Sequence, residues 1–173
     1  MKNCESIVIP DEELIKSEKK RKQYAELEVT IRELIKDETD LIANAANTAA
    51  LIYHALPDIN WAGFYFLRGD ELILGPFQGK PACTRIPLGK GVCGTAALER
   101  KTLVIPDVQK FPGHIACDSA SNSEIVIPLI KNNKLLGVLD IDSPSLGRFV
   151  AEDQKGLDCL AEIFIEKSEI AGI

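Results

Sequence analysis

The segment EIVIPLIKNNKLLGVLDID, residues 124–142, consists of two apolar runs separated by two asparagines. Each run, 124–131 and 134–142, has the length and composition of a β-strand. Asn132 and Asn133 suit the positive φ values of a tight hairpin turn. The segment therefore predicts an antiparallel hairpin, and with it a sheet that is antiparallel at least here.

Counting outward from the turn sets the expected pairing of these two strands. If the lysines that flank the turn face each other, Glu124 opposes Ile141 and lies near the pair Asp140 and Asp142. The two aspartates are two residues apart, so their side chains project from one face of the strand. We expect three carboxyl groups to converge there, although a solvated strand end would also explain the aspartates taken alone.

Three converging carboxyl groups have a chemical use. Their mutual repulsion raises at least one carboxyl pKa, which keeps a proton available for general acid catalysis, while the other carboxylates hold a ligand ammonium. Trp61 and Tyr65 are four residues apart on another predicted strand and therefore share a face. They could wall a small apolar cavity or belong to the ordinary core.

Outside the hairpin, the apolar periodicity predicts helices at both ends of the chain and further strands between them. Helices are expected at 17–36, from a cap at Thr39 or Asp40 to about 56, at 92–99 and at 151–169, and strands at 61–67, 71–74 and 102–105. Helices followed by hairpin-connected strands and a closing helix favour an α+β sandwich over a doubly wound parallel fold. The Gly89-Lys90-Gly91 stretch lacks the spacing of a phosphate-binding loop.

The composition limits the number of domains, the kinds of partner and the location of the protein. The chain has 173 residues, 46% of them hydrophobic and 27% charged, and a formal net charge of −6. These values suit one folded domain and argue against nucleic acid as a partner. No apolar run is long enough to span a membrane, and the acidic beginning of the chain lacks the features of a signal peptide. We therefore expect a cytoplasmic protein.

The five cysteines lack the short paired spacing of zinc sites, so we expect no bound metal. Cys117 lies in a polar loop that supplies more hydrogen-bonding groups than a core residue needs, which favours a reactive thiol. Cys83 also lies in a loop. Cys93 begins the helix predicted at 92–99, where the helix dipole would favour a thiolate, but a small packing residue also fits. Cys4 and Cys159 are expected to have no role in chemistry.

Together these features are found in one known family. The segments that carry the similarity are NWAGFY (60–65), GPFQG (75–79), KPAC (80–83), FPGHIACD (111–118), SNSE (121–124) and LDIDS (139–143). They strongly resemble the free methionine-R-sulfoxide reductases, a family built on the GAF fold. The similarity covers about half of the chain, and generic GAF domains do not share these cysteines together with these acids.

The resemblance implies a GAF fold over residues 1–173, with a central antiparallel sheet, helices on one face and active-site loops on the other. Residues 1–20 would form a partly helical N-terminal extension. The implied activity is thiol-dependent reduction of free methionine-R-sulfoxide, without a bound cofactor and with electrons from NADPH through thioredoxin. The resemblance leaves open whether the protein forms a homodimer.

The resemblance also implies the roles of individual residues. Cys117 would attack the sulfoxide, Cys83 would resolve the resulting sulfenic acid, and Cys93 would be an auxiliary thiol. The substrate pocket would be formed by Trp61, Tyr65, Glu124, Asp140 and Asp142, with Glu124 as the proton donor.

Other functions compete with this reading. A non-catalytic GAF domain could bind a small molecule, or could sense oxidants through a Cys83–Cys117 pair. A hydrolase could use Cys117 with His114, which is only three residues away. A zinc site formed by the three loop cysteines and His114 would lack short ligand pairs.

Overall fold

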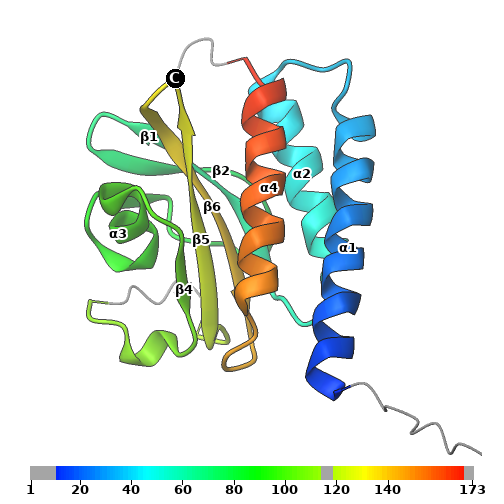
Figure 1. Ribbon diagram of the computed structural model, residues 1–173. Helices are drawn as coiled ribbons and strands as arrows, with labels where there is room; N and C mark the ends of the chain where they lie inside the picture. The colour runs from blue at the N-terminus through cyan, green and yellow to red at the C-terminus, as the bar shows by residue number, and fades with distance from the viewer. Residues whose placement is uncertain (1–10, 114–118, 170–173) are drawn as a thin grey trace, which may run out of the picture.

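The computed structural model describes residues 11–113 and 119–169, which form a layered α+β fold (Figure 1). Its sheet is antiparallel, with the strand order β3-β2-β1-β6-β5-β4. The strands are β1 (Trp61–Arg68), β2 (Glu71–Gly79), β3 (Arg85–Pro87), β4 (Leu103–Ile105), β5 (Ser123–Lys131) and β6 (Lys134–Ser143). The helices are α1 (Glu12–Leu34), α2 (Leu41–Ala55), α3 (Gly91–Glu99), the 3-10 turn η1 (Val108–Lys110) and α4 (Ala151–Lys167). The predicted α+β class is confirmed.

The sheet separates two apolar cores. On one face, α2 and α4 lie on the strands and α1 packs outside them (Figure 1), in a core that includes Phe64, Leu139 and Phe164. On the other face, α3 and the loops cover a smaller core that includes Trp61 and Tyr65. The strands supply both cores because successive side chains point to opposite faces. The expected division into a helical face and a loop face is confirmed, with α3 on the loop face.

The predicted pairing of the central hairpin is wrong by one residue. Glu124 pairs with Asp142 and not with Ile141, because the register shifts between Leu129, which pairs with Gly137, and Ile130, which pairs with Leu135. One extra residue on β6 is therefore a β-bulge, which inverts the alternation of the strand beyond it. Asn132 and Asn133 have positive φ values of 50° and 60°, as the turn required.

This bulge decides which face the acids share. Directly paired residues of antiparallel strands project to the same face, so Glu124 shares its face with Asp142 and Asp140. In the predicted register it would have shared the face of Ile141, which is buried in the core under the helices. The predicted convergence of the three acids is thus confirmed, but it depends on a bulge that the pairing count did not include.

Helix α1 begins at Glu12, five residues before the predicted start. The Asp11 side chain accepts a hydrogen bond from the Glu13 N–H at 3.1 Å and caps the helix. Residues 12–20 of the proposed N-terminal extension are therefore helical. None of the helices in the described ranges has both the length and the apolar character that a membrane span requires.

A buried ion cluster joins α1 to α4. Asp153 is 1% exposed; it pairs with Lys20 and accepts hydrogen bonds from Tyr24 Oη at 3.0 Å and Arg148 Nη1 at 3.1 Å. Burial acts to raise the pKa of Asp153, but the hydrogen bond from Lys20 and the charge of Arg148 outweigh it and hold the pKa below its usual value. The carboxylate therefore stays ionised and links two helices and the loop before α4.

Gly137, beside the bulge, tests how tightly the register is fixed. A Cβ added at this position would lie 1.9 Å from the Tyr65 carbonyl oxygen, so the backbones of β6 and β1 would have to separate. We expect Gly137→Ala to lower the free energy of unfolding by about 3 kcal/mol, measured by urea denaturation. Gly69→Ala is the comparison: no other described residue lies within 4 Å of its added Cβ, so only its positive φ of 62° opposes the change, at about 1–2 kcal/mol. Equal stability of the Gly137 variant and the wild type would contradict the tight packing.

Candidate active site

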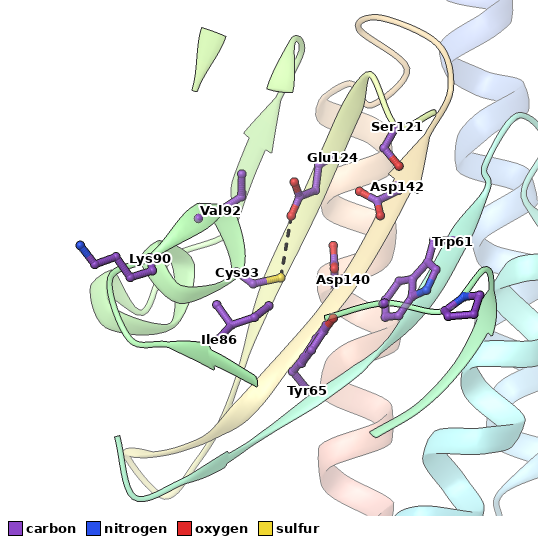
Figure 2. Close-up of a pocket in the computed structure, with 13 residues that line it drawn as sticks. Trp61, Tyr65, Ile86, Lys90, Val92, Cys93, Ser121, Glu124, Asp140 and Asp142 are labelled. Atoms are coloured by element: carbon purple, nitrogen blue, oxygen red, sulfur yellow. Dashed lines mark hydrogen bonds between the residues drawn. The ribbon is translucent and has the colours of Figure 1, made fainter. Parts of the chain in front are cut away.

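A small pocket opens on the loop face of the sheet, between β1, β5 and β6 on one side and the first turn of α3 on the other (Figure 2). Its lining combines aromatic, aliphatic, acidic and thiol side chains. The residues are Trp61, Tyr65, Pro81, Ala82, Ile86, Lys90, Gly91, Val92, Cys93, Ser121, Glu124, Asp140 and Asp142. All five of the substrate-binding residues expected from the sequence are among them.

The three carboxyl groups reach the pocket from two adjacent strands. Glu124 stands at the start of β5, and Asp140 and Asp142 stand near the end of β6. Glu124 and Asp140 are each only 6% exposed, and among residues 11–113 and 119–169 no group donates a hydrogen bond to Asp140 Oδ1. A buried carboxylate oxygen without a donor is costly. The pocket is therefore suited to a ligand that brings positive charge or N–H groups.

Burial and mutual repulsion keep protons in this cluster. Burial raises the pKa of Glu124 well above its usual value, and the negative charges of Asp140 and Asp142 raise it further. Burial also raises the pKa of Asp140, to about 7. Close carboxyl groups cannot all ionise at neutral pH. The pocket can thus offer a proton donor and a carboxylate at the same time.

Cys93 adds a thiol to the cluster. It lies in the first turn of α3, and its Sγ donates toward Glu124 Oε1 at 3.8 Å. Burial raises the pKa of Cys93, and the charges of Asp140 and Glu124 raise it further. Both effects act against the thiolate that the helix dipole would favour, and the buried position of Cys93 suits a packed thiol.

The other cysteines fall into two groups. Cys83, in the segment between β2 and β3, is disulfide-bonded. Cys159 is free and half-buried, and it packs beside the core under the helices, as expected of a packing residue. Cys117, the predicted attacking thiol, lies outside the described residues, and so do His114 and Cys4.

Two aromatic side chains connect the Cys83 segment to the sheet. Trp61 and Tyr65 stack with their ring centroids 5.9 Å apart. Trp61 Nε1 donates to the Lys80 carbonyl at 3.1 Å, and Tyr65 Oη donates to the Cys83 carbonyl at 3.0 Å. Burial and the nearby acids raise the pKa of Tyr65, so its phenol stays protonated as a donor. The apolar wall of the pocket thereby positions the disulfide segment.

Some pocket residues were not singled out from the sequence. Ser121 lies in the SNSE motif, and its hydroxyl accepts a hydrogen bond from Asn60 at 3.1 Å. The Gly89-Lys90-Gly91 stretch lacks the spacing of a phosphate-binding loop. Its last two residues nevertheless line the pocket, because α3 begins at Gly91. Lys90 belongs to it, but its ammonium points away from the carboxylates (Figure 2). The glycines at the start of the helix predicted at 92–99 were the sequence feature from which this side of the pocket could have been predicted.

Comparisons with known proteins bear on this arrangement. The GAF domain family matches residues 30–164, which include the whole pocket. The free methionine-R-sulfoxide reductase of Escherichia coli (strain K12) is 58% identical over 134 residues, which are 78% of this chain and 81% of that protein. The free methionine-R-sulfoxide reductase of Saccharomyces cerevisiae is 52% identical over 135 residues, 73% of this chain and 74% of that protein.

Solved structures agree with these sequence matches. The structure of free methionine-R-sulfoxide reductase from Neisseria meningitidis in complex with its substrate has a TM-score of 0.83 and 47% sequence identity to this chain. The alignment covers 86% of this chain and 90% of that one. The pocket, the fold and the sequence thus lead to one assignment: the chain belongs to the free methionine-R-sulfoxide reductases, a family built on the GAF fold.

Proposed function

We propose that this chain reduces free methionine-R-sulfoxide to methionine. The observation that carries the proposal is a group of three acids, of which Glu124 and Asp140 are buried, beside an aromatic wall to which the disulfide-bonded Cys83 is attached. The names of the relatives in Escherichia coli and yeast, and of the Neisseria structure with its substrate, support it.

The acids account for selection of a free amino acid. Asp140, with its unpartnered Oδ1, and Asp142 would bind the substrate ammonium. A peptide-bound methionine sulfoxide carries an uncharged amide at this position and would leave the buried carboxylates without a counter-charge. Trp61 would contact the methyl end of the side chain.

The reaction then needs a proton and two thiols. Glu124 would donate the proton to the sulfoxide oxygen, since its raised pKa keeps it protonated. The Cys117 thiolate would attack the sulfoxide sulfur, which releases methionine and leaves a sulfenic acid on Cys117. Cys83 would condense with that sulfenic acid to form a disulfide and water. The sulfoxide sulfur is reduced by two electrons, which the two thiols supply.

The disulfide must be reduced before another turnover. Methionine and water leave, but the disulfide stays on the protein and must be reduced by an external dithiol. We infer that thioredoxin, supplied with electrons from NADPH, is this dithiol. The disulfide of Cys83 supports this scheme, but it would also suit a redox sensor. A sensor would form the disulfide with peroxide and would not turn over methionine sulfoxide.

The first test separates enzyme from sensor by NADPH consumption with thioredoxin and thioredoxin reductase. We expect turnover with free methionine-R-sulfoxide but not with its S epimer or a peptide-bound sulfoxide. Cys117→Ser should abolish turnover, and Cys83→Ser should stop it after one cycle. Cys159→Ser is the matched control, because that thiol packs beside the opposite core. Disulfide formation with peroxide but no turnover of any sulfoxide would favour the sensor.

The proton donor is tested by Glu124→Gln. Loss of a general acid is expected to lower kcat roughly 100-fold or more. In the wild type, kcat/KM should fall as the pH rises through the raised pKa of Glu124, because the protonated form is the active one. This alkaline fall should be absent from the residual activity of the variant. Glu99→Gln, on the exposed end of α3, should behave like the wild type. Full activity of Glu124→Gln would remove the proton-donor role.

Binding of the ammonium is tested by Asp140→Asn. Loss of a buried charge-assisted hydrogen bond is worth about 1.5–3 kcal/mol, so kcat/KM for the free substrate should fall roughly 10- to 100-fold, mainly through KM. The exposed Asp37→Asn is the control. An unchanged KM in Asp140→Asn would show that the ammonium binds elsewhere.

A further inference from the structure

One group of side chains in the pocket has the composition of a metal site. The ligand atoms of Cys93, Glu124 and Asp140 all lie within 4.8 Å of one another, and all three residues are buried. The pair of Cys93 Sγ and Glu124 Oε1 is 3.8 Å apart. Figure 2 shows the three side chains pointing toward one another from α3, β5 and β6.

A second observation indicates that this group lacks a ligand. The Asp140 side chain points into the cluster (Figure 2) and is only 6% exposed, and its Oδ1 has no hydrogen-bond partner among the described residues. A carboxylate oxygen removed from water is stabilised either by a donor or by a cation. The substrate ammonium is one cation that fits, but a metal ion would meet the same need when no substrate is present.

We propose that the pocket also binds a thiophilic divalent cation, such as Zn²⁺, through Cys93, Glu124 and Asp140, and that this ion competes with the amino acid. Zn²⁺ binds thiolate sulfur at about 2.3 Å and carboxylate oxygen at about 2.0–2.2 Å, so tetrahedral ligands lie roughly 3.5 Å apart. The observed 3.8 Å is close to this separation. Asp142, in the same pocket, or a water molecule could complete the site.

The donor set selects the kind of ion. Mg²⁺ and Ca²⁺ prefer oxygen ligands alone, whereas one thiolate with carboxylates favours Zn²⁺ or Cd²⁺. Binding would displace the proton of the Cys93 thiol and any proton on the carboxyl groups, and these protons would be released to solvent. The ion would act as an inhibitor and not as a cofactor. Its binding does not rest on the proposed reaction; only the inhibition does.

The site can be tested on the oxidised protein, in which Cys83 is not available as a ligand. Cys4→Ser and Cys159→Ser remove two further cysteines, and with Cys83 and Cys117 joined in the disulfide of the proposed function, Cys93 is the thiol that reports. We titrate this protein with Cd²⁺ alone and follow the ultraviolet charge-transfer band of a cadmium–thiolate bond, together with proton release. The expected result is a band that saturates at one ion per chain. No band, or no saturable binding, would overturn the proposal.

Two variants of this protein locate the ion. Cys93→Ser should abolish the band, and Asp140→Asn, which keeps the thiol, should weaken Cd²⁺ binding at least about tenfold. Folding of both variants is checked by urea denaturation, and Asp140→Asn alone decides the outcome if Cys93→Ser is unfolded. Unchanged affinity in Asp140→Asn would overturn the proposed site.

Competition is measured on the same oxidised protein, because reduced Cys83 and Cys117 would bind zinc themselves. Free methionine-R-sulfoxide should raise the apparent Kd for Cd²⁺ in proportion to its concentration. If Cd²⁺ binds but the sulfoxide leaves its Kd unchanged, the competitive part of the proposal is wrong. The NADPH assay is independent of this titration, so failure of the proposed reaction and failure of the metal site give different results.

Discussion

The pairing of β5 with β6 controls the chemistry of the whole molecule. A strand presents alternate residues to alternate faces, so inserting one residue reverses every position beyond it. On the far side of the bulge, Leu139 and Ile141 face the helices, while Asp140 and Asp142 face the pocket. One irregularity thus places apolar groups in the core and acidic groups in the site, without changing the hairpin turn.

The buried acids of the pocket lower the stability of the folded protein, but they are needed to bind the ligand. Glu124 and Asp140 are held out of water next to each other, and burial raises the pKa of both. Elsewhere the protein treats a buried acid differently: Asp153 is paired with Lys20 and Arg148. The contrast indicates that a ligand supplies the counter-charge at Asp140, because Asp153, the buried carboxylate that joins the helices, has two cationic partners.

Much of this arrangement could be predicted from the sequence, since the signals are local. The Asn132-Asn133 turn, the cap of α2 at Asp40 and the apolar periodicity are each set by a few adjacent residues. The register could not, because a bulge depends on how β6 fits against β1 at Gly137, where Tyr65 comes close. The start of α1 was missed because Leu14 and Ile15 are exposed and continue no apolar stripe.

The site shows the same division. Asp140, Asp142 and Glu124 could be grouped because they belong to one hairpin, and the aromatic pair because it shares a strand. The part of the pocket formed by α3 and Ser121 is brought there by tertiary structure, which no spacing encodes. For Cys83, Cys93 and Cys117 the family resemblance assigned roles that local context alone left open.

The ion cluster at Asp153 limits how far the protein can be shortened at its N-terminus without loss of stability. The matched GAF range begins at residue 30, but Lys20 and Tyr24 precede it and hold a carboxylate that is 1% exposed. A fragment trimmed to the family boundary would keep Asp153 and Arg148, lose the other two partners, and uncover Gly156, over which the Tyr24 ring lies. The cooperative folding unit is therefore larger than the unit that sequence families define, because one face of the first helix belongs to its core.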